Sequence, residues 1–133
     1  MRNLKIILVF IFMYVNILFS ETLMERVIKL INYGNYDEAI SLLETNGEQQ
    51  NDILLAIAYL GKKDFKTAKI FALQYWLQQE KNVLANYLLA FICEELKEYD
   101  TAVVYWENVF KNTKDTSLKQ LAKKHINVLK KLN

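Results

Sequence analysis

Two stretches of this chain repeat in register at a step of 34 residues. Leu54-Leu55-Ala56 recurs as Leu88-Leu89-Ala90, and Thr67-Ala68 recurs as Thr101-Ala102. A period of this length is typical of stacked helical hairpins, in which each repeat buries its apolar face against its neighbours. The repeat therefore predicts an all-α array and favours a function in binding.

Few residues interrupt the helical pattern. Proline is absent and glycine occurs only at positions 34, 47 and 61, so the chain can form long helices with few breaks. We predict one helix that ends before Gly34-Asn35, followed by helices over about 37–46, 51–61, 65–79, 82–96, 99–112 and 115–132. No alternating strand pattern competes with these helices. No linker is long enough to divide the array into domains.

Small and aromatic side chains recur at fixed offsets in the predicted hairpins. Where the two helices of a hairpin cross closely, only small side chains fit. We therefore expect Ala56 to face Ala68, and Ala90 to face Ala102. An aromatic side chain at the start of each second helix is expected to fill the gap between neighbouring hairpins; these aromatics are Tyr36, Phe65 and Tyr99.

These offsets resemble the tetratricopeptide repeat family. The matching residues are Gly34 to Ile40 in repeat one, Leu55, Ala56, Tyr59, Phe65 and Ala68 in repeat two, and Leu89, Ala90, Tyr99, Ala102 and Trp106 in repeat three. The resemblance implies an α-α superhelix of three hairpins, about residues 21–47, 50–80 and 82–113, with a capping helix over 115–132. Repeat one departs from the pattern, because Ala39 and Ala68 are only 29 residues apart, and the family's closing proline is missing throughout.

The resemblance also implies a binding surface, because the first helix of each hairpin lines the concave side of such arrays. The family's usual groove positions correspond to Met24, Ile28, Ile31, Ile53, Ile57, Leu60, Tyr87, Phe91 and Glu94. Only Glu94 is charged, whereas family members that clamp charged peptide ends use Lys, Arg and Asn. An apolar groove suits an amphipathic helix or an extended hydrophobic segment. Alternatively, the C-terminal helix or a tightly wound stack covers these residues.

The first twenty residues have the pattern of a signal peptide. Arg2 and Lys5 precede an apolar run from Ile6 to Phe19, and Ser20 offers a small residue before a cut at Glu21. As a helix, this run of about 14 residues would span only about 21 Å, less than the roughly 30 Å hydrocarbon core of a bilayer. We therefore expect an exported, periplasmic protein. The alternatives are an uncleaved membrane anchor over residues 4–23 and a buried N-terminal helix.

Charge is distributed unevenly along the rest of the chain. Residues 21–110 carry 8 basic and 14 acidic side chains, whereas residues 111–133 carry 7 lysines and a single acid, Asp115. The lysines of the last predicted helix lie off its apolar stripe, which consists of Leu118, Leu121, Ala122, His125, Leu129 and Leu132. They either solvate a capping helix or contact an acidic protein or an anionic membrane surface. Nucleic acid is disfavoured, since the chain without residues 1–20 is neutral.

No residue pattern indicates catalysis. His125 lies on an apolar stripe and has no nearby Ser or Cys to activate, Cys93 is expected to pack as a small hydrophobe, and Glu94, Glu95 and Glu98 are expected to be solvated. Phosphate loops and metal-ligand spacings are absent from the sequence, so we expect no cofactor and no small-molecule substrate. The sequence thus predicts a non-catalytic protein–protein interaction scaffold in a bacterial cell envelope. The alternative is a membrane-tethered structural subunit of an envelope assembly complex.

Overall fold

The computed structural model describes residues 22–46 and 51–132, which form seven α-helices and no strand. The helices are α2 (Leu23–Asn32), α3 (Tyr36–Asn46), α4 (Asp52–Gly61), α5 (Phe65–Gln78), α6 (Val83–Glu95), α7 (Tyr99–Asn112) and α8 (Thr116–Leu129). The all-α prediction is confirmed for these residues. The predicted helix bounds agree with the observed ones to within three residues. The largest difference is at the last helix, which was predicted to end at residue 132 and ends at Leu129.

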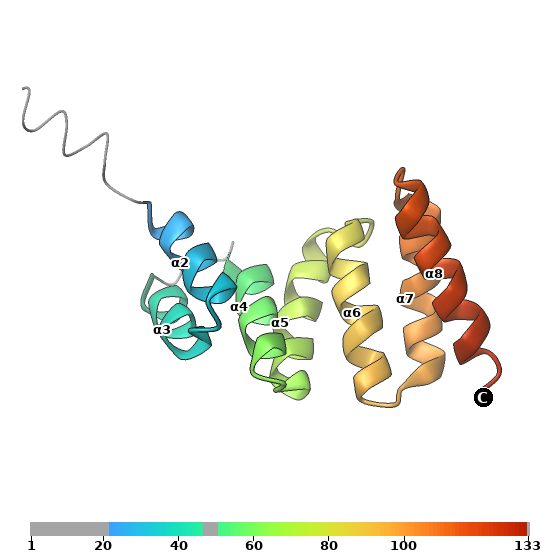
Figure 1. The fold of residues 1–133 in the computed structure, drawn as a ribbon, viewed down its shortest axis with the longest axis horizontal. Coiled ribbons are helices and arrows are strands. Elements are labelled where there is room, and N and C mark those ends of the chain that lie inside the picture. Colours follow the sequence, from blue (N-terminus) through green and yellow to red (C-terminus); the bar gives the residue numbers. More distant parts are fainter. Residues whose placement is uncertain (1–21, 47–50, 133) are drawn as a thin grey trace, which may run out of the picture.

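The helices pack in chain order along the long axis of the molecule, with α2 near one end and α8 at the other (Figure 1). Each helix contacts the next one, and in addition α2 contacts α4 and α4 contacts α6. In the view of Figure 1, α7 lies behind α8, which follows α6 in the front row. We use the term first-helix face for the solvent-facing side of α2, α4, α6 and α8.

Polar side chains cap the starts of four helices, α2, α5, α6 and α8. At α2 the cap is reciprocal: the Glu25 N–H donates to Thr22 Oγ1 over 3.2 Å, and the Thr22 N–H donates to Glu25 Oε2 over 2.9 Å. Carboxylate or amide oxygens of Asp64, Asn82 and Asp115 accept backbone N–H bonds at the starts of α5, α6 and α8. These bonds satisfy N–H groups that have no partner within the helix.

Three turns between helices place a residue in the left-handed region of backbone conformation. Gly34 follows α2 with φ of 78°, as its position predicted. Lys63 and Lys97 take the same role after α4 and α6, each with φ of 62°. Glycine adopts this conformation at no steric cost, whereas lysine does so with some strain. The turn geometry is therefore shared by all three hairpins even where the glycine is not.

The predicted close crossings between alanines lie in the core. Ala56, Ala68, Ala90 and Ala102 are all fully buried. Ala56 and Ala68 belong to one apolar cluster, while Ala90 and Ala102 belong to the next. The absence of larger side chains at these positions is what allows the backbones of paired helices to approach.

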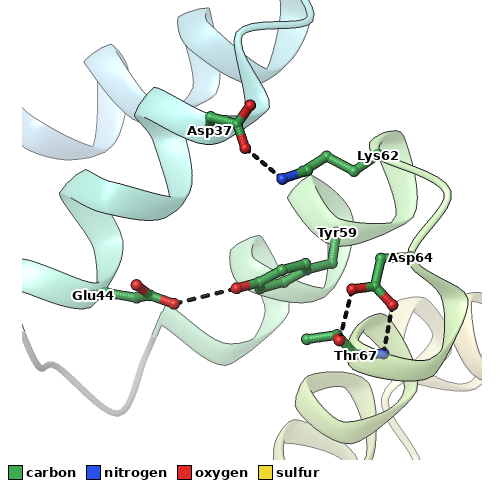
Figure 2. A network of polar contacts seen from close by, with 6 residues as sticks. All are labelled: Asp37, Glu44, Tyr59, Lys62, Asp64 and Thr67. Atoms are coloured by element: carbon green, nitrogen blue, oxygen red, sulfur yellow. Dashed lines mark hydrogen bonds and ion pairs between the residues drawn. The ribbon is translucent and has the colours of Figure 1, made fainter.

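Tyr36 joins the first hairpin to the second. Its ring packs against Gly61 at the end of α4, so closely that a Cβ at Gly61 would lie 2.3 Å from the ring. This contact confirms the expected role of Tyr36 in filling the gap between hairpins. Two polar contacts support the same junction: Lys62 forms an ion pair with Asp37, and the Tyr59 hydroxyl donates to Glu44 over 3.2 Å (Figure 2).

One polar side chain is fully buried between the last two hairpins. Asn86 on α6 accepts hydrogen bonds from Trp76 Nε1 and Asn108 Nδ2, both over 3.2 Å. Its own amide donates to the backbone carbonyls of Glu80 and Asn82 over 2.7 and 2.8 Å. The sequence pattern did not predict this network, which connects α5, α6 and α7. Because its bonds are satisfied, burial of the amide carries little penalty.

Candidate functional site

The predicted groove residues of the first two hairpins differ in how far they are buried. Met24 and Ile28 on α2 are exposed. Ile31 is half-buried against the cluster around Val27 and Leu43. On α4 the three predicted residues, Ile53, Ile57 and Leu60, are all half-buried and pack partly against the core cluster of α4, α5 and α6. These α4 residues therefore serve the core as well as the surface.

The predicted residues of the third hairpin lie on α6. Tyr87 and Phe91 are half-buried. The Tyr87 ring meets the Trp106 ring edge to face, with centroids 5.4 Å apart and planes at 89°, a favourable geometry for two aromatic rings. Tyr87 thus supports the core between α6 and α7 while its remaining surface faces solvent.

An apolar cleft separates α6 from α8. It has a volume of about 480 Å³ and is lined by Val83, Leu84 and Tyr87 on α6 and by Leu118 and Leu121 on α8. Leu84 is 47% exposed and Leu121 is 36% exposed. The predicted apolar stripe of α8 is therefore not fully covered.

The sequence prediction missed Leu84 as a site residue. Leu84 lies three residues before Tyr87, so the two share one side of α6. Extending the predicted groove by one helical turn would have included it. The contribution of Leu121 was not predictable in this way, because it depends on how α8 is rotated against α6.

Glu94 is the centre of a polar and aromatic cluster. Its Oε1 accepts a hydrogen bond from Trp106 Nε1 and lies 2.7 Å from His125 Nδ1. The His125 ring stacks on the Trp106 ring, with centroids 4.5 Å apart. The expectation that Glu94 is solvated was therefore wrong, because contacts with α7 and α8 hold its carboxylate, while the expected packing role of His125 agrees with these contacts.

A smaller cavity adjoins this cluster. Its volume is about 150 Å³, and its lining consists of Glu94 on α6 with Lys124, His125, Val128 and Leu129 on α8. The Lys124 side chain is exposed, and among the described residues it forms no ion pair. This places one free ammonium group beside the apolar surface of α6 and α8.

The remaining side chains considered for catalysis are Cys93, Glu95 and Glu98. Cys93 is fully buried and packs as a small hydrophobe, as predicted. Because burial desolvates the thiol, its pKa is raised to about 12. Glu98 forms an ion pair with Lys69, and a hydrogen bond from Lys69 lowers the pKa of the Glu98 carboxyl. The Glu98 side chain is nevertheless 39% exposed, so its carboxylate stays partly in solvent, and Glu95 is exposed, as expected for both acids.

Two further findings concern residues 22–46 and 51–132 alone. Within these ranges no three His, Cys, Asp or Glu side chains gather as a metal site would require. The helices of the same ranges are all too short or too polar to cross a membrane. The predicted signal segment, residues 1–20, lies outside the described part of the chain.

No family model matches the chain, and no curated protein matches it in sequence.

Proposed function

We propose that this protein is a non-catalytic protein–protein interaction scaffold whose first-helix face binds an apolar or amphipathic segment of a partner protein. The apolar cleft between α6 and α8 carries this proposal. Two large apolar side chains, Leu84 on α6 and Leu121 on α8, are exposed on the two sides of this cleft. Clustered apolar side chains at a surface mark interaction sites more often than single exposed ones do.

The proposal includes a tetratricopeptide-like superhelix as the scaffold. Three observations support it: the 34-residue step between repeats two and three, the contacts of α2 with α4 and of α4 with α6, and the packing of Tyr36 on Gly61. In a stack of this type each hairpin contacts only its neighbours, and the row of first helices presents a continuous surface. Met24 and Ile28 extend that surface onto α2.

The proposed location is the periplasm of a bacterium, after removal of residues 1–20. The sequence of that segment is the support, with its basic start and short apolar run. N-terminal sequencing of the protein from cells tests this part. A chain that starts at Glu21 agrees with export and cleavage, whereas a chain that retains residues 4–23 supports a membrane anchor.

A second candidate function is a membrane-tethered structural subunit. The distribution of charge on α8 favours it: the helix carries Lys119, Lys123 and Lys124 and no acidic residue. Lysines near an anionic bilayer contribute about 1 kcal/mol each. In this arrangement residues 4–23 would remain in the membrane, and α8 would lie against its surface.

Site-specific photo-crosslinking in cells tests whether the first-helix face contacts a partner protein. A photoreactive residue at Leu84 or Leu121 is expected to give the same protein adduct, because both positions border one cleft. Thr101, which is exposed on α7, is the matched control and should give none. An adduct pattern that is the same at all three positions, or no adduct at Leu84 and Leu121, would contradict the proposal.

A further inference from the structure

We propose that the α6–α8 cleft binds an amphipathic helix with acidic residues beside its apolar face, and that Lys124 binds one of those carboxylates. This inference rests on the proposed function, because it names the kind of segment that the first-helix face receives. It concerns the C-terminal part of that face alone.

The lining of the cleft favours a side chain of a protein over a small polar molecule. A volume of about 480 Å³ is enough for large side chains, and the five lining residues are Val83, Leu84, Tyr87, Leu118 and Leu121. Sites that bind small molecules also contain a few polar groups whose positions fix the orientation of the ligand. Here the Tyr87 hydroxyl is the only polar side-chain group in the lining, so apolar contact must supply most of the affinity.

The spacing along α8 favours a helical occupant. Leu121 and Val128 are both exposed apolar residues, seven positions apart, which corresponds to about 10.5 Å along the helix. Apolar side chains at positions i and i+7 of a partner helix have the same spacing, as in other helix-in-groove complexes. A helix lying alongside α8 would therefore meet both side chains.

Charge next to the cleft favours acidic residues on that helix, because Lys124 lines the smaller cavity beside Glu94, one turn along α8 from Leu121. Lys124 lies between Leu121 and Val128 on the same side of α8, since positions i, i+3 and i+7 share one helical face. The nearest acid, Glu94, already accepts a hydrogen bond from Trp106 and contacts His125. The Lys124 ammonium has no ion pair among the described residues, so a carboxylate of the occupant can bind it without displacing an internal contact.

Lys123 provides a matched control on the same helix. It is exposed like Lys124, and among residues 22–46 and 51–132 it also has no ion pair. It lies about 200° around the helix from Leu121, so it faces away from the cleft. A general attraction between the basic helix and any anionic surface would use both lysines, whereas the proposed contact uses Lys124 alone.

The test uses the full chain and three labelled synthetic peptides of about five helical turns, with binding measured by fluorescence anisotropy at low salt. The first peptide has a Leu/Phe face and a Glu face, the second has Lys in place of Glu, and the third keeps Glu but has Ser in place of Leu and Phe. We expect the first peptide to bind about tenfold more tightly than the second. The third peptide should not bind, because apolar contact supplies the affinity.

Three variants locate the contact. Lys124→Gln should weaken binding of the Glu peptide about fivefold, the upper range for an exposed ion pair, while Lys123→Gln leaves it unchanged. Leu121→Ser should weaken binding of the Glu and the Lys peptides alike. Circular dichroism of each variant should match that of the parent protein, which excludes unfolding as the cause.

The outcomes separate this inference from the proposed function. Equal binding of the Glu and Lys peptides, with both weakened by Leu121→Ser, would keep the apolar site but overturn the acidic preference. Equal losses in Lys123→Gln and Lys124→Gln would overturn the role of Lys124. Binding to phosphatidylglycerol vesicles with no binding of any peptide would overturn both the inference and the protein-binding function, in favour of the membrane surface.

Discussion

The first and third hairpins have the same order of helices but differ in what stabilises them. In α2 only Val27 is buried, whereas α6 buries seven residues, including Asn86 and Cys93. The first hairpin has an exposed ion pair, Arg26–Glu38 at 3.0 Å, between its helices. The third has the buried indole of Trp106, which donates to Glu94. Exposed ion pairs contribute little to stability, whereas a buried aromatic ring contributes several kcal/mol.

This difference shows how an array can combine a rigid part with a weakly held end. Stability in a stack of repeats depends on each unit and on its contacts with neighbours. Among the described residues the first hairpin packs against one neighbouring hairpin and has a small core, so it depends strongly on the contact of Tyr36 with Gly61. The proposed binding cleft lies at the other end, between α6 and α8, where the core holds the helices in place.

The largest effect is expected from removing the aromatic core of the third hairpin. Trp106→Ala should lower the free energy of unfolding by about 3–5 kcal/mol, because it leaves a cavity and removes a donor to Glu94. Urea denaturation followed by circular dichroism measures the change. Val27→Ala is the matched change in the first hairpin and should lower it by about 1–2 kcal/mol. Equal losses in the two variants would mean that the hairpins do not differ as described.

A smaller effect is expected at the junction of the first two hairpins. Replacing a helical glycine by alanine usually stabilises a helix by up to about 1 kcal/mol. Gly61→Ala should instead destabilise the protein by about 1–3 kcal/mol, because its Cβ would overlap the Tyr36 ring. Amide hydrogen exchange should show faster opening in α2 and α3 than in α6 and α7. In a Tyr36→Leu background the same substitution should cost less; an unchanged cost would exclude the ring as the cause.

The smallest effect is expected from the ion pair between Lys69 on α5 and Glu98, the residue directly before α7. The hydrogen bond from Lys69 lowers the pKa of Glu98 relative to its ordinary value. A lowered carboxyl pKa stabilises the folded state above the ordinary pKa, and this stabilisation is lost as pH falls through the lowered value. The free energy of unfolding, measured by denaturation at pH 7 and near pH 3, should therefore include a loss below about 1 kcal/mol that is absent in Glu98→Gln.

Glu38→Gln, at the exposed pair of the first hairpin, is the control for simple loss of a surface carboxylate. If Glu98→Gln and Glu38→Gln have the same pH dependence, the Lys69–Glu98 contact makes no specific contribution.

Much of the fold could be predicted from short stretches of sequence. Asp64, Asn82 and Asp115 are good N-cap residues, and their caps depend only on residues three positions away. The alanines at the crossings of the second and third hairpins could also be predicted, because the 34-residue step places them in equivalent positions, and Tyr36 could be predicted from its place three residues before Ala39. Helix α6 was predicted to within one residue at each end, and Tyr87 and Phe91 are half-buried on it, whereas their role in binding stays a prediction.

The candidate site could be predicted only in part. Glu94 was expected to face solvent, yet Trp106 and His125, 12 and 31 residues away, hold its carboxylate. Leu121 was placed in the apolar stripe of the last helix, but its position at the border of an open cleft was not predicted. Neither outcome follows from helical periodicity, because periodicity gives the direction of a side chain on its own helix and not the position of the next helix.

Local sequence was thus sufficient for the helices, their ends and their order, because capping and periodic burial depend on neighbours within a few residues. The 34-residue step added the pairing of those helices into hairpins. The internal bonding of Asn86 and Glu94, and the cleft beside Lys124, came from the way α5, α6, α7 and α8 pack against one another. Burial of a polar group is tolerated only when partners from other helices complete its hydrogen bonds, and that condition is met in space rather than along the chain.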